Sequence, residues 1–221
     1  ATHTTPDALS LNALLAEMLA SGCTHVFMEV SSHAVVQKRI FGLTFKGAIF
    51  SNITRDHLDF HETFDAYIKA KKGFFDALPK SAFALTNVDD KRGAVMLQNT
   101  KAQKASYGIL ESADFKAKIK ANVLSGLQLE LDGREIHAQL IGQFNAYNLL
   151  AIYGTAIELG MESLEALRLL SELESVSGRF QYIVSAANIT AIVDYAHTPD
   201  ALENVLKTIN DIRTKNEQLI T

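Results

Sequence analysis

An acidic residue lies at the end of an apolar stretch near the start of the chain. Residues Cys23 to Val30 are mostly apolar and predict a buried strand, and Glu29 precedes the run Ser31-Ser32-His33. A buried carboxylate is costly unless it is paired or binds a cation, and Mg²⁺ prefers oxygen ligands. Glu29 is therefore a candidate Mg²⁺ ligand. The alternative is a carboxylate that is hydrogen-bonded to the backbone or paired with an arginine.

A second polar run, Asn52 to His61, follows the apolar segment Gly47–Phe50, which predicts another strand. Ligands of parallel α/β sheets gather beyond the carboxyl ends of the strands, so we expect this run at the same sheet edge as Glu29. His57 and His61 are four residues apart and would share one face of a helix, as zinc ligands often do. The alternative is a hydrogen-bonded turn that caps a helix.

Lys71 lies near the centre of an apolar helical face. The predicted helix Phe64–Leu78 has six apolar residues on this face, and Lys71 is four residues from both Tyr67 and Phe75. A lysine that faces inward must extend its amine to the surface, form an ion pair or change its protonation. A neutral amine can also react with carbon dioxide to give an anionic, metal-binding carbamate. Both a structural and a chemical role are open for Lys71.

Two further polar runs lie at predicted helix starts in the second half of the chain. Asn145 and Asn148 open the helix after Gly142. Their amides could read the edge of an adenine ring, or Asn145 could cap the helix. Asp194 and His197 lie at the end of a predicted strand, where the N–H groups of the next helix favour a phosphate or ribose. An N-cap at Thr198 explains part of this turn, but not Asp194 and His197 together.

The elements that would position these residues alternate between helices and strands. A helix over Asp7–Ala20 and a short strand over Ala82–Leu85 complete the pattern of the first hundred residues. This alternation predicts an α/β fold with a mostly parallel sheet flanked by helices.

The pattern changes after about Gln103. Three strand-like runs predict a small antiparallel sheet, with Asp132-Gly133 as a hairpin turn: Phe115–Val123, Leu127–Leu131 and Ile136–Ile141. Ser175–Gly178 is typical of a hinge. The remaining predicted elements are helices Ala146–Leu159 and Ser163–Leu173, strands Gln181–Val184 and Ile189–Tyr195, and helix Pro199–Lys215.

The composition is that of an ordinary globular protein, with 48% apolar residues and a net charge of −4. It argues against nucleic-acid binding, which needs a basic stripe.

No apolar run approaches the ~20 residues of a membrane helix, and no signal peptide is visible. The lone Cys23 predicts a buried core residue and fits a reducing cytoplasm. The sequence contains no G-x-x-x-x-G-K-[ST] phosphate loop.

Taken in order, these segments resemble the Mur ligases, ATP-dependent enzymes that form amide bonds in peptidoglycan precursors. No single segment is specific for this family, whereas the complete set in this order is. Among the family, the set is most similar to the members that add the third residue of the stem peptide. The matching segments are Thr4–Asp7, Met28–His33 with Gln37 and Arg39, Thr54–His61, Tyr67–Lys71, Asn87–Asp90, Gly142–Asn148, Gly178-Arg179 and Asp194–Leu202.

The resemblance implies a role for each candidate residue. Glu29 and His57 would bind Mg²⁺, and Lys71 would be a carbamylated lysine that helps to place a second Mg²⁺; His57 and Lys71 would thus be the catalytic residues. The UDP-MurNAc-L-Ala-D-Glu substrate would be held by Thr4, Thr5, Ser31, Gln37 and Arg39. ATP would be contacted by Asn145, Asn148, Arg179, Asp194 and His197, with His197 near the phosphates.

The resemblance also implies a reaction and a domain organisation. ATP would phosphorylate the terminal glutamate carboxylate of the substrate, and the amine of meso-diaminopimelate, or less favoured L-lysine, would attack the acyl phosphate. Residues 1–178 would form a central domain with a P-loop-type fold that lacks its phosphate loop, and residues 179–221 the start of a Rossmann-like C-terminal domain. The family's phosphate loop would precede Ala1, so we expect this fragment to be inactive alone. A cytoplasmic monomer that binds neither nucleic acid nor membrane is expected.

Other functions remain open at this point. A relative such as a folate polyglutamate ligase or another Mur enzyme is one, although Arg39 and the Thr4-Thr5 pair favour the third-residue ligases. A zinc-dependent hydrolase using His57 and His61 is another. A third is a non-catalytic module that binds a nucleotide sugar without turning it over.

Overall fold

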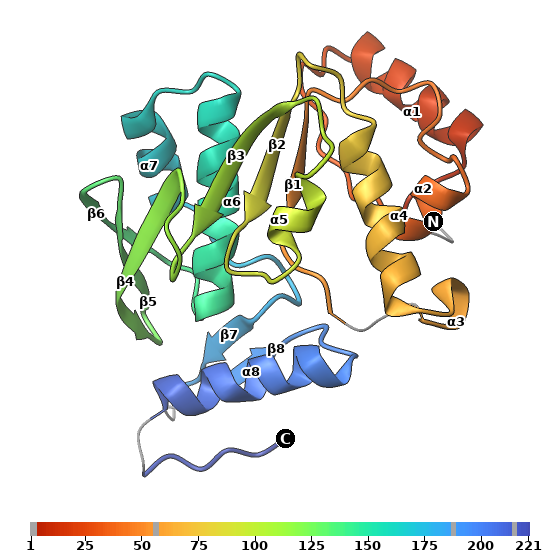
Figure 1. The fold of residues 1–221 in the computed structure, drawn as a ribbon. Helices are drawn as coiled ribbons and strands as arrows, with labels where there is room; N and C mark the ends of the chain where they lie inside the picture. Colours follow the sequence, from red (N-terminus) through yellow and green to blue (C-terminus); the bar gives the residue numbers. More distant parts are fainter. Residues whose placement is uncertain (1–3, 55–57, 187–188, 214–215) are drawn as a thin grey trace. The chain divides into compact units, whose positions relative to one another are not determined.

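A computed structural model describes residues 4–54, 58–186, 189–213 and 216–221 of the chain (Figure 1). The chain divides into two compact units, residues 1–106 and 107–221, here called the first and the second unit. Strand β3 (Gln103–Gly108) lies partly in each of them.

The first unit alternates helices and parallel strands. Its elements are α1 (Ala8–Ala20), α2 (Ser32–Val36), β1 (Gly47–Phe50), α3 (Leu58–His61), α4 (Phe64–Asp76), β2 (Phe83–Asn87) and α5 (Gly93–Met96), followed by the start of β3. The strand order is β1-β2-β3. Strands β1 and β2 are parallel, in a register that runs from Gly47 opposite Phe83 to Phe50 opposite Thr86. The predicted parallel sheet with flanking helices is confirmed here.

Helix α4 forms because a polar cap precedes a run with one apolar face. The Thr63 hydroxyl accepts a hydrogen bond from the Ala66 N–H at 3.2 Å, which satisfies one of the unpaired donors of the first turn. Tyr67, Ile68 and Phe75 are buried on the inner face and join a hydrophobic core that includes residues of β1 and β2. The helix thereby fixes the direction in which its other residues, Lys71 among them, leave the core.

The segment Cys23–Val30 is not the buried strand that its apolar composition predicts. In the described part of the chain, no strand is assigned between α1 and α2. Cys23 is exposed, and Phe27 is 71% exposed. A strand needs a neighbour to pair its backbone groups, and apolar composition cannot say whether such a neighbour is present. The prediction of a buried core position for Cys23 is wrong for the same reason.

The second unit contains the antiparallel sheet. Its elements are the end of β3, β4 (Phe115–Val123), β5 (Gly126–Leu131), β6 (Arg134–Ala138), α6 (Gln143–Glu158), α7 (Ser163–Ser171), β7 (Gln181–Val184), β8 (Thr190–Val193) and α8 (Pro199–Ile212). The order is β3-β4-β5-β6; β3 and β4 are parallel, whereas β4–β5 and β5–β6 are antiparallel. Strands β7 and β8 form a separate antiparallel pair.

The hairpin between β5 and β6 has the predicted turn. Asp132 and Gly133 have φ values of 54° and 72°, the pair of positive angles that a type I′ turn requires. Helix α6 begins after Gly142, whose φ is 97°. A Cβ at this glycine would lie 2.7 Å from the Phe144 ring and 3.0 Å from the Thr208 methyl group. The alternative that Asn145 caps the helix is wrong, because Gly142 is the N-cap and Asn145 is already inside the helix.

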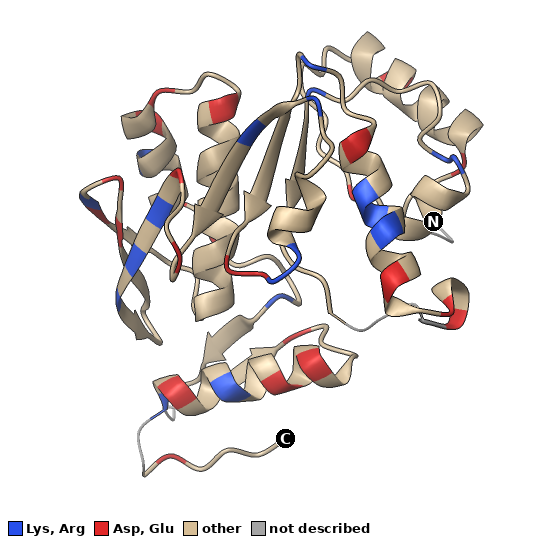
Figure 2. Cartoon of the chain, viewed as in Figure 1, with Lys and Arg blue, Asp and Glu red and all other residues tan. Residues whose placement is uncertain are grey.

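Charged side chains of both signs are mixed along the helices. Figure 2 shows lysines between acidic residues on α4 and on α8. No helix within the described ranges is long and apolar enough to cross a membrane.

Candidate active site

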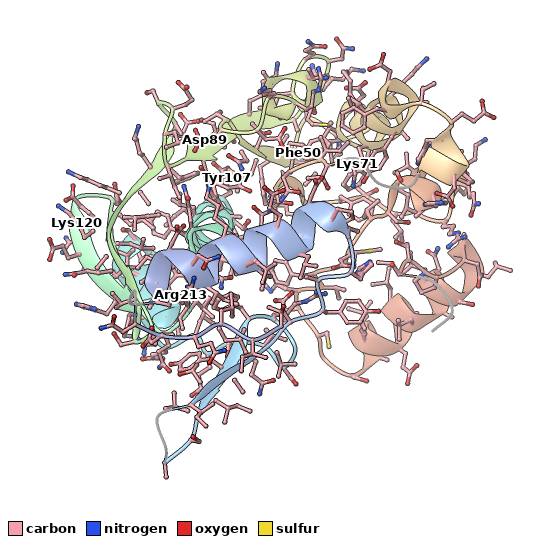
Figure 3. The ribbon with its side chains drawn as sticks, turned by 90° about the horizontal axis from the view of Figure 1, so that it is seen from below. Phe50, Lys71, Asp89, Tyr107, Lys120 and Arg213 are labelled. Atoms are coloured by element: carbon pink, nitrogen blue, oxygen red, sulfur yellow. The ribbon has the colours of Figure 1, made fainter. Side chains whose placement is uncertain are left out.

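A cavity of about 550 Å³ opens in the first unit between residues 26–31, β1 and α4. Figure 3 labels two of its lining residues, Phe50 at the end of β1 and Lys71 on α4. Four of the predicted site residues line this cavity: Thr4, Glu29, Ser31 and Lys71. The structure thus brings together residues that are separated by up to 67 positions in the sequence, from Thr4 to Lys71.

Thr5 holds the segment that carries Glu29. Its side chain is fully buried, and its hydroxyl donates to the Glu29 carbonyl at 2.9 Å and accepts from the Ser31 N–H at 3.3 Å. The Arg39 guanidinium in turn donates to the Thr5 carbonyl at 2.9 Å. These bonds hold the main chain between the Glu29 carbonyl and the Ser31 N–H. Thr5 and Arg39 therefore brace the cavity wall.

The other predicted substrate residues have different environments. Thr4 is exposed and lines the cavity. The Ser31 hydroxyl caps α2 by accepting from the Ala34 N–H at 3.1 Å. Gln37 is the exposed residue that ends α2, and it does not line the cavity.

Lys71 faces inward, as the helical periodicity predicts. It is half-buried, and its Nζ lies 5.2 Å from the centre of the Tyr67 ring, one helical turn earlier. The neighbouring lysines on α4 differ from it. Lys69 is exposed, and Lys72 forms an ion pair with Asp76 at 2.6 Å. Lys71 is thus the lysine of this helix that lines the cavity.

His61 is buried beside α2 and α4. Its Nε2 lies 2.8 Å from the Ser32 Oγ, and its ring stacks on Tyr67 with 5.2 Å between centroids and 26° between planes. His57, its predicted partner, lies outside the described residues. Within the described ranges, no group of three or more His, Cys, Asp or Glu side chains could hold a metal ion.

The donor chemistry around the cavity nevertheless fits a hard cation. Glu29 is exposed and not buried as its apolar surroundings in the sequence predicted. Glu29 and Asn52 are both lining residues, and their side chains carry oxygen atoms, the ligands that Mg²⁺ prefers. A carbamate on Lys71 would add further oxygen atoms.

The loop that carries Asn52 is held by residues to which the sequence assigned no role. The Asn87 amide donates to the Ser51 carbonyl at 2.9 Å. The Asp90 carboxylate accepts from the Ile53 N–H at 3.1 Å and from the Arg92 N–H at 2.8 Å. The run Asn87–Asp90 begins at the last residue of β2, so its position at a strand end was the local signal for this function.

A second group of predicted residues gathers in the second unit around Tyr195. The Asp194 carboxylate accepts from the Phe180 and Ala196 N–H groups, both at 2.7 Å. The Arg179 guanidinium lies 5.5 Å from the centre of the Tyr195 ring, and the His197 ring lies 5.1 Å from it. The structure brings Arg179, Asp194 and His197 together. Sequence reasoning missed Tyr195, although it lies within the same run.

Asn145 and Asn148 lie on the first turns of α6. Asn145 is buried, donates to the Ile141 carbonyl at 2.8 Å and accepts from the Asn148 amide at 3.0 Å. Asn148 is exposed. The Phe144 ring packs edge-on against Phe180, with centroids 5.6 Å apart. This contact joins the start of α6 to the segment that carries Arg179.

Comparisons with known proteins identify the family of the chain. The family described as the Mur ligase middle domain matches residues 1–156, and the one described as Mur ligase, glutamate ligase domain matches residues 178–221. The chain belongs to the Mur ligase family.

Curated Mur ligases resemble the chain over nearly all of its length. The UDP-N-acetylmuramoyl-L-alanyl-D-glutamate--2,6-diaminopimelate ligase of Cytophaga hutchinsonii is 60% identical over 217 residues, which cover 98% of this chain and 45% of the relative. The ligase of the same name from Halalkalibacterium halodurans is 41% identical, over 95% of this chain and 45% of the relative. The chain therefore spans less than half the length of these relatives.

Solved Mur ligase structures share the fold. A structure of a UDP-N-acetylmuramoyl-L-alanyl-D-glutamate--2,6-diaminopimelate ligase matches with a TM-score of 0.82 and 32% identity, over 96% of this chain and 45% of that one. A MurF ligase from Thermotoga maritima, solved in complex with ADP, matches with a TM-score of 0.65 at 18% identity, over 76% of this chain and 39% of that one. Membership of a ligase family removes the support for the zinc-hydrolase alternative, which rested on the spacing of His57 and His61 alone.

Proposed function

We propose that this chain supplies the central part of an ATP-dependent ligase that adds meso-diaminopimelate to UDP-MurNAc-L-Ala-D-Glu. The observation that carries the proposal is the shared cavity of Glu29 and Lys71, in a chain 60% identical to a relative with that name. L-Lysine is the alternative amino acid. The chemistry needs a site that tolerates a concentration of negative charge, because a carboxylate, a triphosphate and an acyl phosphate meet there.

The cavity wall would bind the substrate's acidic end. Thr4 and Ser31 line the cavity and can donate hydrogen bonds to a carboxylate. Gln37 and Arg39, which follow the last residue of α2, would also contact the substrate. Thr5 would hold the wall in place through its bonds to Glu29 and Ser31. The terminal glutamate carboxylate would thus be oriented before it is phosphorylated.

Glu29 and His57 would hold Mg²⁺, and Lys71 would act as a carbamate that helps to place a second Mg²⁺. To form the carbamate, the neutral Lys71 amine bonds to the carbon of carbon dioxide and releases one proton. When bound, the metal ions offset the negative charge on the transferred phosphoryl group. The half-buried position of Lys71 beside Tyr67 supports this assignment.

The second unit would contribute to ATP binding. Asn148 exposes an amide that can meet an adenine edge, and Asn145 orients it. Arg179 and His197, which both lie beside the Tyr195 ring, would contact the nucleotide. Asp194 would act at this site by holding the main chain at Phe180 beside the main chain at Ala196.

We also propose a domain boundary at residues 178/179, with a central domain before it and the start of a C-terminal domain after it. The separate family matches to residues 1–156 and 178–221 support this boundary. The division between the two compact units falls earlier, within β3. A cytoplasmic, monomeric enzyme is part of the same proposal.

The test is a ligase assay on a chimera in which this chain replaces the matching segment of the Cytophaga hutchinsonii relative. We expect phosphate release that requires ATP, UDP-MurNAc-L-Ala-D-Glu and meso-diaminopimelate together, and none from the chain alone. UDP-MurNAc-L-Ala, which lacks the acceptor glutamate, is the matched negative substrate. A folded chimera without activity, beside an active parent enzyme, would overturn the proposal.

A further inference from the structure

We propose that His61 is a positioning residue that sets the place of Lys71 in the cavity through the ring of Tyr67. The inference rests on the proposed role of Lys71. His61 is 8% exposed and does not line the cavity, so it would act through its neighbours.

The first observation is the bond between His61 and α2. The His61 Nε2 lies 2.8 Å from the hydroxyl of Ser32, which is itself 1% exposed. Buried polar groups are costly to leave without a partner, so this bond holds the Nε2 edge of the imidazole against α2. Ser32 is the first residue of α2 and follows the segment that carries Glu29 and Ser31. His61 is thereby attached to the wall of the cavity that holds Glu29.

The second observation is the stack between His61 and α4. The imidazole lies nearly parallel to the Tyr67 ring, at 26° and 5.2 Å, and the Lys71 Nζ lies 5.2 Å from the centre of that ring. Residues four apart on a helix share a face, so the position of Tyr67 determines what Lys71 packs against. The contacts run from Ser32 through His61 and Tyr67 to Lys71.

Histidine can make both contacts at once, the hydrogen bond to Ser32 and the stack on Tyr67. A phenylalanine at position 61 would keep the aromatic stack and lose the bond to Ser32. A glutamine could keep a bond to Ser32 and would lose the stack. A histidine in this place therefore couples the segment of Glu29 to the helix of Lys71. A merely space-filling ring would not require the nitrogen.

The experiment measures how fast the Lys71 amine is acetylated by a short pulse of acetic anhydride. The chain is digested, and modification of Lys71 is read by mass spectrometry relative to Lys69, which is exposed on the same helix. Wild type is compared with His61→Phe, His61→Gln and Ser32→Ala, the last of which removes the same bond from the other side. His137→Ala, at an exposed histidine of β6, is the matched control.

We expect the Lys71-to-Lys69 ratio to rise several-fold in His61→Phe, His61→Gln and Ser32→Ala, and to stay at the wild-type value in His137→Ala. Circular dichroism identifies the variants that remain folded. A ratio that is unchanged in folded His61→Phe and Ser32→Ala would overturn the inference. A loss of stability without a change in this ratio would likewise assign His61 a structural role only.

A second readout separates this inference from the proposed function. In [¹³C]bicarbonate, a carbamate carbon resonance that disappears in Lys71→Ala would support the role proposed for Lys71, and we expect it to weaken in His61→Phe. A resonance that persists in Lys71→Ala would contradict that role. The acetylation ratio would still decide whether His61 positions the amine.

Discussion

The two groups of polar residues differ in what the fold does with their side chains. In the first unit, the Glu29 main-chain carbonyl accepts a hydrogen bond from Thr5, and Glu29 is an exposed residue of the cavity lining. In the second unit, both carboxylate oxygens of Asp194 accept backbone N–H groups. A polar run in a sequence therefore contains two kinds of residue, those that meet a ligand and those that hold the backbone.

The largest expected effect is at Lys71. In the ligase chimera, Lys71→Ala should lower kcat by about 100-fold or more, because it removes a group that helps to stabilise developing negative charge. The matched change Lys69→Ala, on the exposed side of the same helix, should leave kcat near the parent value. Steady-state phosphate release measures both. Equal losses in the two variants would place Lys71 outside the chemistry.

Asp194 should matter mainly for stability. Asp194→Ala removes two charge-assisted hydrogen bonds at a half-buried turn and should lower the free energy of unfolding by about 2 kcal/mol. Urea denaturation measures this change, with Glu203→Ala on the exposed surface of α8 as control. If Asp194→Ala weakens ATP binding while the unfolding midpoint is unchanged, Asp194 is a ligand contact and the contrast between the two units fails.

Thr5 tests the first unit, where a buried hydroxyl holds the main chain at the cavity wall. Thr5→Val keeps the volume of a fully buried side chain but removes the bonds to Glu29 and Ser31, at a cost of about 1–2 kcal/mol of unfolding free energy. The exposed neighbour Thr4 should tolerate Thr4→Val within about 0.5 kcal/mol. Comparable midpoints for the two variants in chemical denaturation would show that Thr5 does not brace the cavity wall.

The smallest expected effect is a change in Tm on substitution of Glu158, the last residue of α6. Burial, and then the charge of Asp114, raise the pKa of the Glu158 carboxyl above its ordinary value of 4.5. Its contribution to stability is therefore full below pH 4.5 and is lost as the pH rises through the raised pKa. Glu158→Gln should raise Tm slightly at pH 7 and have little effect at low pH. A lower Tm at pH 7 would contradict this.

Local patterns predicted those elements whose signals are local. Strands β1 and β4 have the predicted bounds, and the Asp132-Gly133 turn follows from two residues that accept positive φ. Helix α1 begins within one residue of its predicted start, after an Asp7 cap. Strand β3 and the short helices α2 and α5 were not predicted. A helix of four or five residues is too short to show the helical repeat of apolar residues, and β3 lacks the apolar run that marks β1.

The sequence predicted the inward face of α4, whereas it could not predict which distant residues contact one another around the cavity. The inward position of Lys71 follows from helical spacing alone. The bond from Thr5 to Glu29 joins residues 24 positions apart, and the bond from His61 to Ser32 joins residues 29 apart. No local pattern encodes such pairs. The strand predicted at Cys23–Val30 failed for the related reason that strand pairing depends on a distant partner.

A titration of the chain with Mg²⁺ in bicarbonate buffer, followed by calorimetry, tests most directly whether the cavity of the first unit is the chemical centre. We expect a saturable binding event in wild type that disappears in Glu29→Gln and persists in Asp194→Asn. Equal Mg²⁺ affinity in wild type and a folded Glu29→Gln variant would contradict the assignment of the metal to this cavity.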